Sequence, residues 1–125
     1  MNSIKLELPL PPAINASYGV TSSKKGISYM YKRAEAKRWQ RDAFLLIYSQ
    51  TKDHSMFNEQ VVVKCELHLK RDRDVDSSFK LLCDTLENAK IIKNDRQIVE
   101  ISARKFYPSK ESKMLVEIYV DSTTR

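Results

Sequence analysis

Residues 60–70 show the clearest alternation of apolar and polar side chains in the chain. Every second residue from Val61 to Leu69 is apolar, and most residues between them are polar. Because successive side chains of a strand point to opposite faces, this pattern predicts a strand with one buried face. The strand leads directly into the stretch from Arg71 to Asp76, and a strand end holds such side chains rigidly. The chain is therefore expected to be organised around this strand and the acidic stretch that follows it.

The acidic stretch places Asp74 and Asp76 one residue apart. In an extended segment both side chains lie on the same side, where two anions repel each other unless a cation lies between them. Mg²⁺ is usually held by one or two protein carboxylates together with oxygens of a phosphate-bearing substrate. The stretch therefore favours a Mg²⁺ site beside an anionic substrate.

An apolar-periodic segment follows and predicts a helix that buries one side. Its apolar stripe comprises Phe79, Leu82, Cys83 and Leu86. Charged residues recur at helical spacing on the other side: Asp76, Lys80, Asp84 and Glu87. Asp95 comes a short connection later, where it could supply a third carboxylate.

These residues also have purely structural interpretations. Asp76, followed by two serines, suits a helix N-cap whose carboxylate accepts backbone N–H groups. Lys80 is spaced to form an i, i+4 pair with Asp76 or Asp84, and Asn94-Asp95 suits a turn. Residue types alone leave both interpretations open, and the combination of residues favours a site.

Four short motifs follow one another through the centre of the chain. They are Arg73-Asp74-Val75-Asp76 with Lys80 four residues on, Asp84-Thr85-Leu86, Asn94-Asp95, and Gln97-Ile98. In order and spacing they resemble the core motif of RusA-type Holliday junction resolvases, which typically reads R-D-x-D-N, K, D-A-L, D-D-x-Q-V. Residues 11–18, PPAINASY, resemble that family's P-P-S-x-N-x-x-Y segment. The resemblance therefore covers nearly the whole chain.

Three positions depart from the family pattern. Ser77 stands where the family usually has Asn, Asn94 replaces the first Asp of the usual pair, and the Gly often found before that pair is absent around Lys90. The missing Asn bears on the positioning of Asp76 and on substrate preference. The expected catalytic set is present in full: Asp74, Asp76, Lys80 and Asp95.

The resemblance implies a Mg²⁺-dependent endodeoxyribonuclease that resolves four-way (Holliday) DNA junctions by paired symmetric nicks in DNA recombination and repair. Metal binding is expected from Asp74, Asp76 and Asp95, and stabilisation of transition-state charge from Lys80. Asp84 is expected to have a structural or supporting role. The alternatives are a less selective branched-DNA or flap nuclease, and a non-catalytic basic DNA-binding protein whose aspartates only cap and pair.

Paired cuts in opposed strands require two sites, so a two-fold homodimer is expected, as the resemblance also implies. The helix around Trp39 is the candidate interface, although Trp39 equally suits the core. The resemblance further implies a cytoplasmic protein of bacterial or phage origin.

Charge composition supports a polyanionic partner. The chain has 22 Lys and Arg against 16 Asp and Glu, a formal net charge of +6, although charge alone proves no DNA binding. The candidate DNA contacts are Asn15, Lys24, Lys25, Arg71 and Arg73. As alternatives, Asn15 only supports a turn, and Lys24 and Lys25 belong to a solvated hairpin.

The remaining patterns predict one α+β domain over residues 1–125. Strands are expected at 3–8, 60–70, 97–106 and 113–120, a hairpin joins 18–21 to 27–31, and helices cover 32–52 and the segment after Asp76. The expected fold is a mixed sheet of about four main strands plus an N-terminal hairpin, with two helices packed on it. Inward-facing positions include Leu46 on the first helix and Val99, Ile101 and Ala103 on the third strand.

Cys65 and Cys83 occupy apolar-periodic positions without metal-ligand spacing. We expect them to be reduced core residues of a cytosolic protein. No apolar run is long enough to span a bilayer, so no membrane role is expected.

Overall fold

The main sheet joins strands from both ends and the middle of the chain. The computed structural model describes residues 3–13, 18–22, 28–52 and 54–123. The four strands lie in the order β1-β6-β4-β5, and their bounds are β1 Ser3–Leu8, β4 Val61–His68, β5 Ile98–Phe106 and β6 Lys113–Val120. β4 pairs parallel with β5 and antiparallel with β6, which pairs antiparallel with β1. The sheet is therefore mixed, as predicted.

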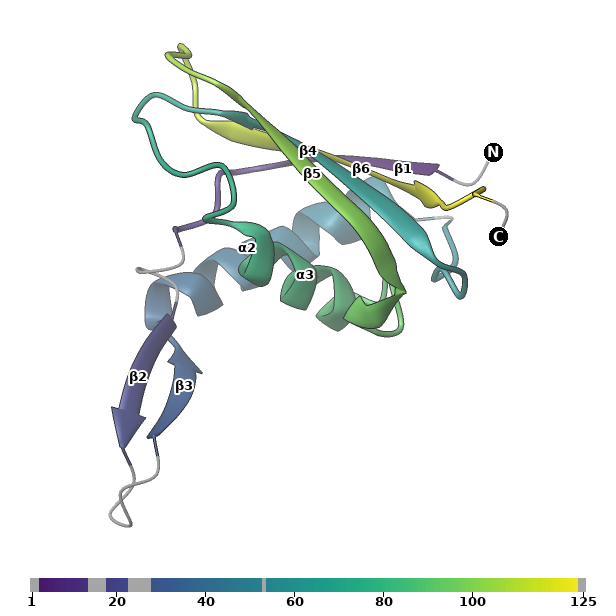
Figure 1. The fold of residues 1–125 in the computed structure, drawn as a ribbon, viewed down its shortest axis with the longest axis horizontal. Coiled ribbons are helices and arrows are strands. Elements are labelled where there is room, and N and C mark those ends of the chain that lie inside the picture. The colour runs from purple at the N-terminus through teal and green to yellow at the C-terminus, as the bar shows by residue number, and fades with distance from the viewer. Residues whose placement is uncertain (1–2, 14–17, 23–27, 53, 124–125) are drawn as a thin grey trace.

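One face of this sheet is covered by two helices, α2 (Ala34–Gln50) and α3 (Phe79–Asn88). Figure 1 shows both helices on the same side of the sheet. The alternate residues of β4 that were predicted to face inward are buried in the common core with leucines of α3. Lys64 and Glu66, on the other face of β4, are exposed. The alternation in residues 60–70 thus correctly predicts which face of the sheet is covered.

A separate two-stranded sheet forms the predicted hairpin from β2 (Tyr18–Ser22) and β3 (Ser28–Lys32). It extends away from the main sheet and helices (Figure 1). Gly19 lies opposite Tyr31, and a Cβ atom at Gly19 would overlap the Tyr31 ring. A side chain at position 19 would therefore require the exposed Tyr31 ring to move. Lys24 and Lys25 at the expected tip, and Asn15 before β2, lie outside the described residues.

The inward position predicted for Val99 is wrong. The pairing of β4 with β5 shifts between Val61 and Val62, so that Val61 pairs with Ile98 and Val62 with Glu100. Val99 is therefore the extra residue of a β-bulge, and its side chain is 37% exposed. Ile101 and Ala103, after the bulge, pack against the core as predicted.

Helix α2 buries one side and exposes large apolar residues on another. Trp39 is only 7% exposed, and its indole Nε1 donates to the Pro9 carbonyl oxygen at 3.0 Å, so it belongs to the core of this chain. The inward position predicted for Leu46 is wrong, since 36% of it is exposed. Leu45 and Tyr48 are exposed by 69% and 72%. Within the described residues, no helix is both long and apolar enough to cross a membrane.

Candidate active site

Asp74 and Asp76 lie in a turn that leads into α3. The backbone N–H of Ser77 donates to the Asp74 carbonyl oxygen, and that of Phe79 donates to the Asp76 carbonyl oxygen, both at 3.2 Å. The expectation of an extended segment is therefore wrong here. The capping interpretation of Asp76 is also wrong, because Ser78 occupies the N-cap position of α3. Both aspartates are exposed.

Arg73 anchors this turn from the inside. Its Nη1 donates to the Pro11 carbonyl oxygen at 2.7 Å and to the Ser78 hydroxyl at 3.3 Å. Burial lowers the pKa of the Arg73 guanidinium. The arginine thus joins the acidic loop to the proline segment that follows β1, a structural role that its residue type did not reveal. DNA contact by Arg73 stays a prediction, and so does contact by the exposed Arg71.

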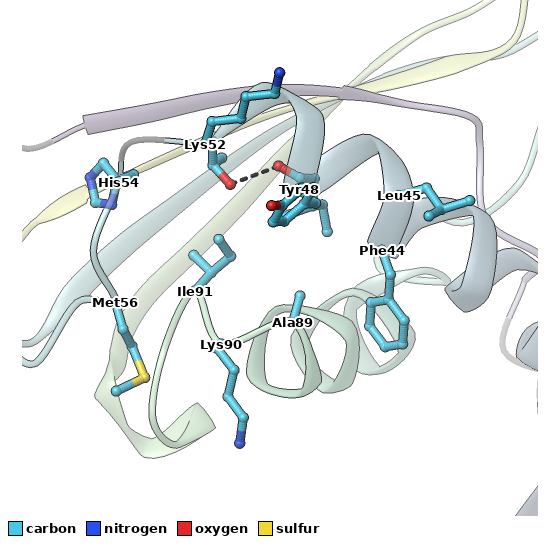
Figure 2. A pocket seen from close by; sticks show the side chains of 11 residues that line it. Phe44, Leu45, Tyr48, Lys52, His54, Met56, Ala89, Lys90 and Ile91 are labelled. Carbon is cyan, nitrogen blue, oxygen red and sulfur yellow. Dashed lines mark hydrogen bonds between the residues drawn. The ribbon is translucent and has the colours of Figure 1, made fainter.

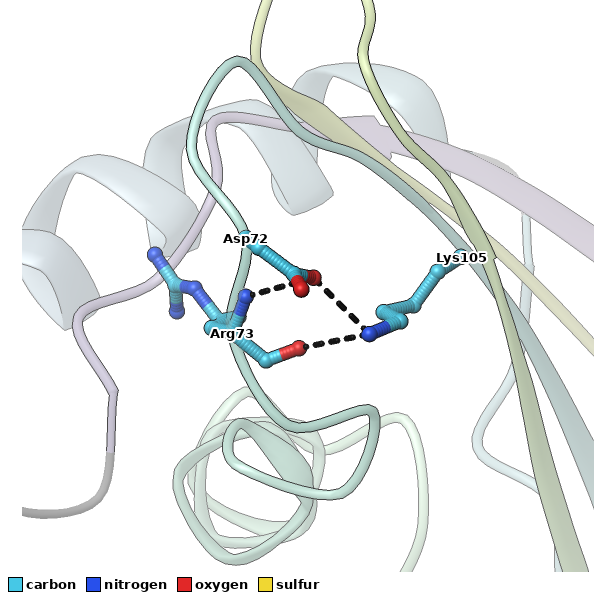
Figure 3. Close-up of polar contacts among 3 residues, drawn as sticks. All are labelled: Asp72, Arg73 and Lys105. Atoms are coloured by element: carbon cyan, nitrogen blue, oxygen red, sulfur yellow. Dashed lines mark hydrogen bonds and ion pairs between the residues drawn. The ribbon is translucent and has the colours of Figure 1, made fainter.

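Lys105 of β5 anchors the same loop from the opposite side. Its Nζ donates to Asp72 Oδ1 at 2.8 Å and to the Arg73 carbonyl oxygen at 3.2 Å. The hydrogen bond from Lys105 lowers the pKa of the Asp72 carboxyl group. Figure 3 shows that the Lys105 side chain reaches the loop from one side, while the Arg73 guanidinium points to the opposite side, away from Lys105. The two anchors fix the backbone immediately before Asp74.

Core packing orients the charged side of α3. Leu81, Leu82 and Leu86 are fully buried. The Thr85 hydroxyl, also buried, donates to the Leu81 carbonyl oxygen at 2.6 Å and accepts from Gln40 Nε2 of α2 at 2.9 Å. Lys80, Asp84 and Glu87 are consequently left on the more exposed part of the helix surface.

Asp95 begins a short 3₁₀ helix, η1 (Asp95–Gln97), so the predicted turn is confirmed. The Asn94 side chain accepts from the Arg96 N–H at 2.8 Å, while Gln97 Oε1 accepts from the Asn94 N–H at 2.9 Å. Gln97 Nε2 also donates to the carbonyl oxygens of Phe57 and Glu59. Asn94 thus serves as the capping acceptor in the position where the related motif has Asp.

Burial raises the pKa of the Cys83 thiol to about 11, with further increases from the charges of Asp95 and Asp84 and an opposing effect of Lys80. Both cysteines are free, as expected. Cys65 is a core residue, and burial raises its pKa to about 12. The core position expected for Cys83 is wrong, since this residue is only partly buried. Lys80 lies in the first turn of α3 and Asp95 in η1, two elements that contact each other.

Glu87 is the one polar residue of this region to which the sequence assigned no role. Its Oε1 accepts a hydrogen bond from the Asp95 backbone N–H at 2.9 Å. In the sequence, the feature that could have pointed to Glu87 is its position on the charged side of the predicted helix. The contact itself depends on how the chain returns after α3.

The carboxylates of the acidic turn and η1 could supply only part of a Mg²⁺ coordination shell. Across the described ranges, no three His, Cys, Asp or Glu side chains form a group that could hold a metal ion, so Asp74, Asp76 and Asp95 do not form a complete protein cage. Mg²⁺ does not need one, because it keeps several waters and takes further oxygens from substrate phosphates. Ser77 Oγ, beside Asp76, is buried and has no hydrogen-bond partner among the described residues, as suits a neighbour of bound water. The donor chemistry fits a hydrated Mg²⁺, and the ligand set stays a prediction.

A separate hollow of about 670 Å³ lies between the C-terminal ends of α2 and α3 (Figure 2). Its walls include Phe44, Tyr48, Met56 and Ile91, and among the residues that the structure describes no carboxylate side chain lines it. The ring of His54, also in the lining, packs at 4.8 Å from that of Phe57. The motif residues lie outside this hollow, and the surface of α3 and its neighbouring turns stays the candidate site.

Comparisons with known proteins agree with the motif. A family model described as Endodeoxyribonuclease RusA matches residues 9–119. This range includes the proline segment, the acidic turn, α3 and η1. A search among curated proteins found no match.

Proposed function

The chain belongs to the RusA endodeoxyribonuclease family, and on that premise we propose that it resolves four-way DNA junctions by Mg²⁺-dependent hydrolysis. The observation that carries the proposal is the family match over residues 9–119, within which the four acidic and basic motif residues fall on one helix and its flanking turns. Recombination and repair are the processes in which such junctions arise.

In this proposal Asp74, Asp76 and Asp95 hold the metal. When bound, Mg²⁺ lowers the pKa of a water molecule and neutralises charge on the reacting phosphate. The protein itself holds the Asp74 carboxylate in position, because Arg73 and Lys105 fix the backbone that carries it. Lys80, in the first turn of α3, supplies a compact positive charge toward the phosphate oxygens.

DNA binding is assigned to the basic surface around this site. Arg71 is exposed next to the acidic turn, and the hairpin extends from the body of the molecule (Figure 1), so it can follow a DNA arm. Asn15, Lys24, Lys25 and Arg73 complete the proposed contacts. Replacing Lys24 and Lys25 together should flatten the salt dependence of binding, since each phosphate contact on duplex DNA contributes about 0.9 to the slope.

Paired nicks call for two copies of the site, and a homodimer is part of the proposal. The exposed apolar residues of α2, Leu45 and Tyr48, border the hollow of Figure 2. They support an interface on this side of α2, in place of one centred on the buried Trp39. Leu45→Glu should yield monomers in sedimentation equilibrium if this is so.

The test of the function is cleavage of a synthetic four-way junction, compared with linear duplex and flap DNA, with and without Mg²⁺. The proposal predicts symmetric, ligatable nicks in the junction only, and only with Mg²⁺. Equal cleavage of flaps would identify a less selective branched-DNA nuclease. Tight binding without cleavage would identify a DNA-binding protein.

A further inference from the structure

Asp95 is held at its backbone rather than by burial. None of the three residues of η1 is buried, so the core does not fix their position. The first end of the turn is tied to α3, where Glu87 Oε1 accepts from the Asp95 N–H at 2.9 Å. The other end is tied by Gln97, whose amide donates to the carbonyl oxygens of Phe57 and Glu59. The position of the Asp95 carboxylate relative to α3 therefore depends on these side-chain contacts.

Glu87 does not stabilise the helix in which it lies. The residue lies in the last turn of the helix, which contains no basic residue. A negative charge there opposes the helix dipole and destabilises the helix. Glu87 instead accepts a charge-assisted hydrogen bond from a backbone N–H that starts another element, where a negative charge is favourable.

Resting on the proposed function, we infer that Glu87 is a positioning residue: through the Asp95 backbone N–H it holds the Asp95 carboxylate in place relative to α3, the helix that carries Lys80. The two elements α3 and η1 contact each other, and the hydrogen bond from the Asp95 N–H to Glu87 Oε1 links them. Without Glu87 the turn keeps its Asn94 cap and its Gln97 contacts but loses this side-chain link to α3. The carboxylate then samples positions away from the site, which weakens its binding of the metal.

Two substitutions separate positioning from direct metal binding. Glu87→Gln keeps an oxygen acceptor at the same distance along the side chain but removes the charge. Glu87→Ala removes both. Asn88→Ala, at the neighbouring exposed position of α3, is the matched control for a change in the helix that leaves the contact intact.

The first measurement uses metal-free protein and does not require activity. Hydrogen exchange of the Asp95 amide should be unchanged in Asn88→Ala and about tenfold faster in Glu87→Ala, as expected for losing one charge-assisted hydrogen bond. Glu87→Gln, which keeps an acceptor but loses the charge, should fall between the two. Unchanged exchange in Glu87→Ala would overturn the inference, because the contact would then not hold the turn.

The second measurement is the affinity for Mn²⁺ without DNA, together with single-turnover cleavage of a junction. Glu87→Ala should lose about ten- to a hundredfold in both, and Glu87→Gln should restore most of the loss. Equal losses in the two variants would overturn positioning in favour of a ligand or charge role. If the wild-type protein cleaves no junction, the proposed function fails, whereas the Mn²⁺ affinities still decide the role of Glu87.

Discussion

The Arg73 guanidinium donates to the Pro11 carbonyl oxygen at 2.7 Å, and so ties the acidic turn to a segment 62 positions earlier in the chain. Arg71, two residues before it, is exposed. Residue type alone does not distinguish these two arginines, although only Arg73 belongs to the family motif, and both were predicted to contact DNA. The structure assigns them different environments, which makes them a matched pair.

Arg73→Ala should lower the free energy of unfolding by about 2 kcal/mol, because it removes hydrogen bonds from a charged donor to partly buried acceptors. Arg71→Ala should leave stability within about 0.5 kcal/mol of wild type and weaken DNA binding in a salt-dependent way. Urea denaturation and junction binding at several salt concentrations measure both effects. Equal stabilities of the two variants would show that the Arg73 contact contributes nothing to the fold.

Lys90 has φ of 63°, in the left-handed region where the related motif often has Gly. Its N–H donates to the Glu87 carbonyl oxygen and that of Ile91 to the Leu86 carbonyl oxygen, a Schellman ending of α3. Lys90→Gly should therefore raise the free energy of unfolding by about 1 kcal/mol, the approximate cost of this conformation for a residue with a Cβ. Lys90→Ala is the control and should bring no such gain. A gain in both variants would trace the effect to the lysine side chain instead of the backbone.

Gly19→Ala should disturb the hairpin, since the new Cβ overlaps the Tyr31 ring. The overlapping atoms belong to the outer end of the exposed Tyr31 side chain, so the ring can move aside. We expect a cost of about 0.5–1.5 kcal/mol, as for a side chain displaced from its preferred rotamer. Hydrogen exchange of the hairpin amides should accelerate, while amides of β4 stay protected. The double variant Gly19→Ala, Tyr31→Ala should restore protection. If it does not, the overlap is not the cause.

Much of the fold follows from short-range patterns in the sequence. The alternation of β4 depends on residues close in the chain and is confirmed. Helix α3 also forms as predicted, but Phe79 and Cys83 of its predicted apolar stripe are only partly buried, and its buried side consists of Leu81, Leu82, Thr85 and Leu86. Val99 was misplaced because a one-residue shift in pairing, invisible in the sequence, displaces it outward. The turn at residues 75–78 was missed for a similar reason, since Arg73 and Lys105 fix that loop through long-range contacts.

In the candidate site too, the sequence predicts the features set by short spacings and misses those set by long-range contacts. Residue types and spacing predict that Lys80 and Asp95 belong to one site, and this stays a prediction. The contact of Glu87 with the Asp95 backbone depends on the return of the chain after Lys90. Only a three-dimensional structure reveals it.

Lys80→Ala should reduce the single-turnover cleavage rate by about a hundredfold or more, as for loss of a group that stabilises transition-state charge. Junction affinity should change little, because ground-state phosphates are shared among many basic residues. Lys80→Arg is not expected to rescue the rate fully, since the planar guanidinium places its charge differently. If Lys80 only forms an exposed pair within the helix, its loss costs about 0.3–0.5 kcal/mol of stability and leaves cleavage unchanged.

The most direct test of the proposed site is single-turnover cleavage of a four-way junction by Asp74→Asn at saturating enzyme and Mg²⁺, with Asp72→Asn as the matched control. Asp72 accepts from Lys105, and an Asn oxygen can still accept there, so the control should cleave at close to the wild-type rate. Asp74→Asn should show no cleavage while binding the junction as well as wild type or slightly better, since one charge that repels phosphate is gone. Wild-type cleavage by Asp74→Asn would contradict the assignment of the acidic turn as the metal site.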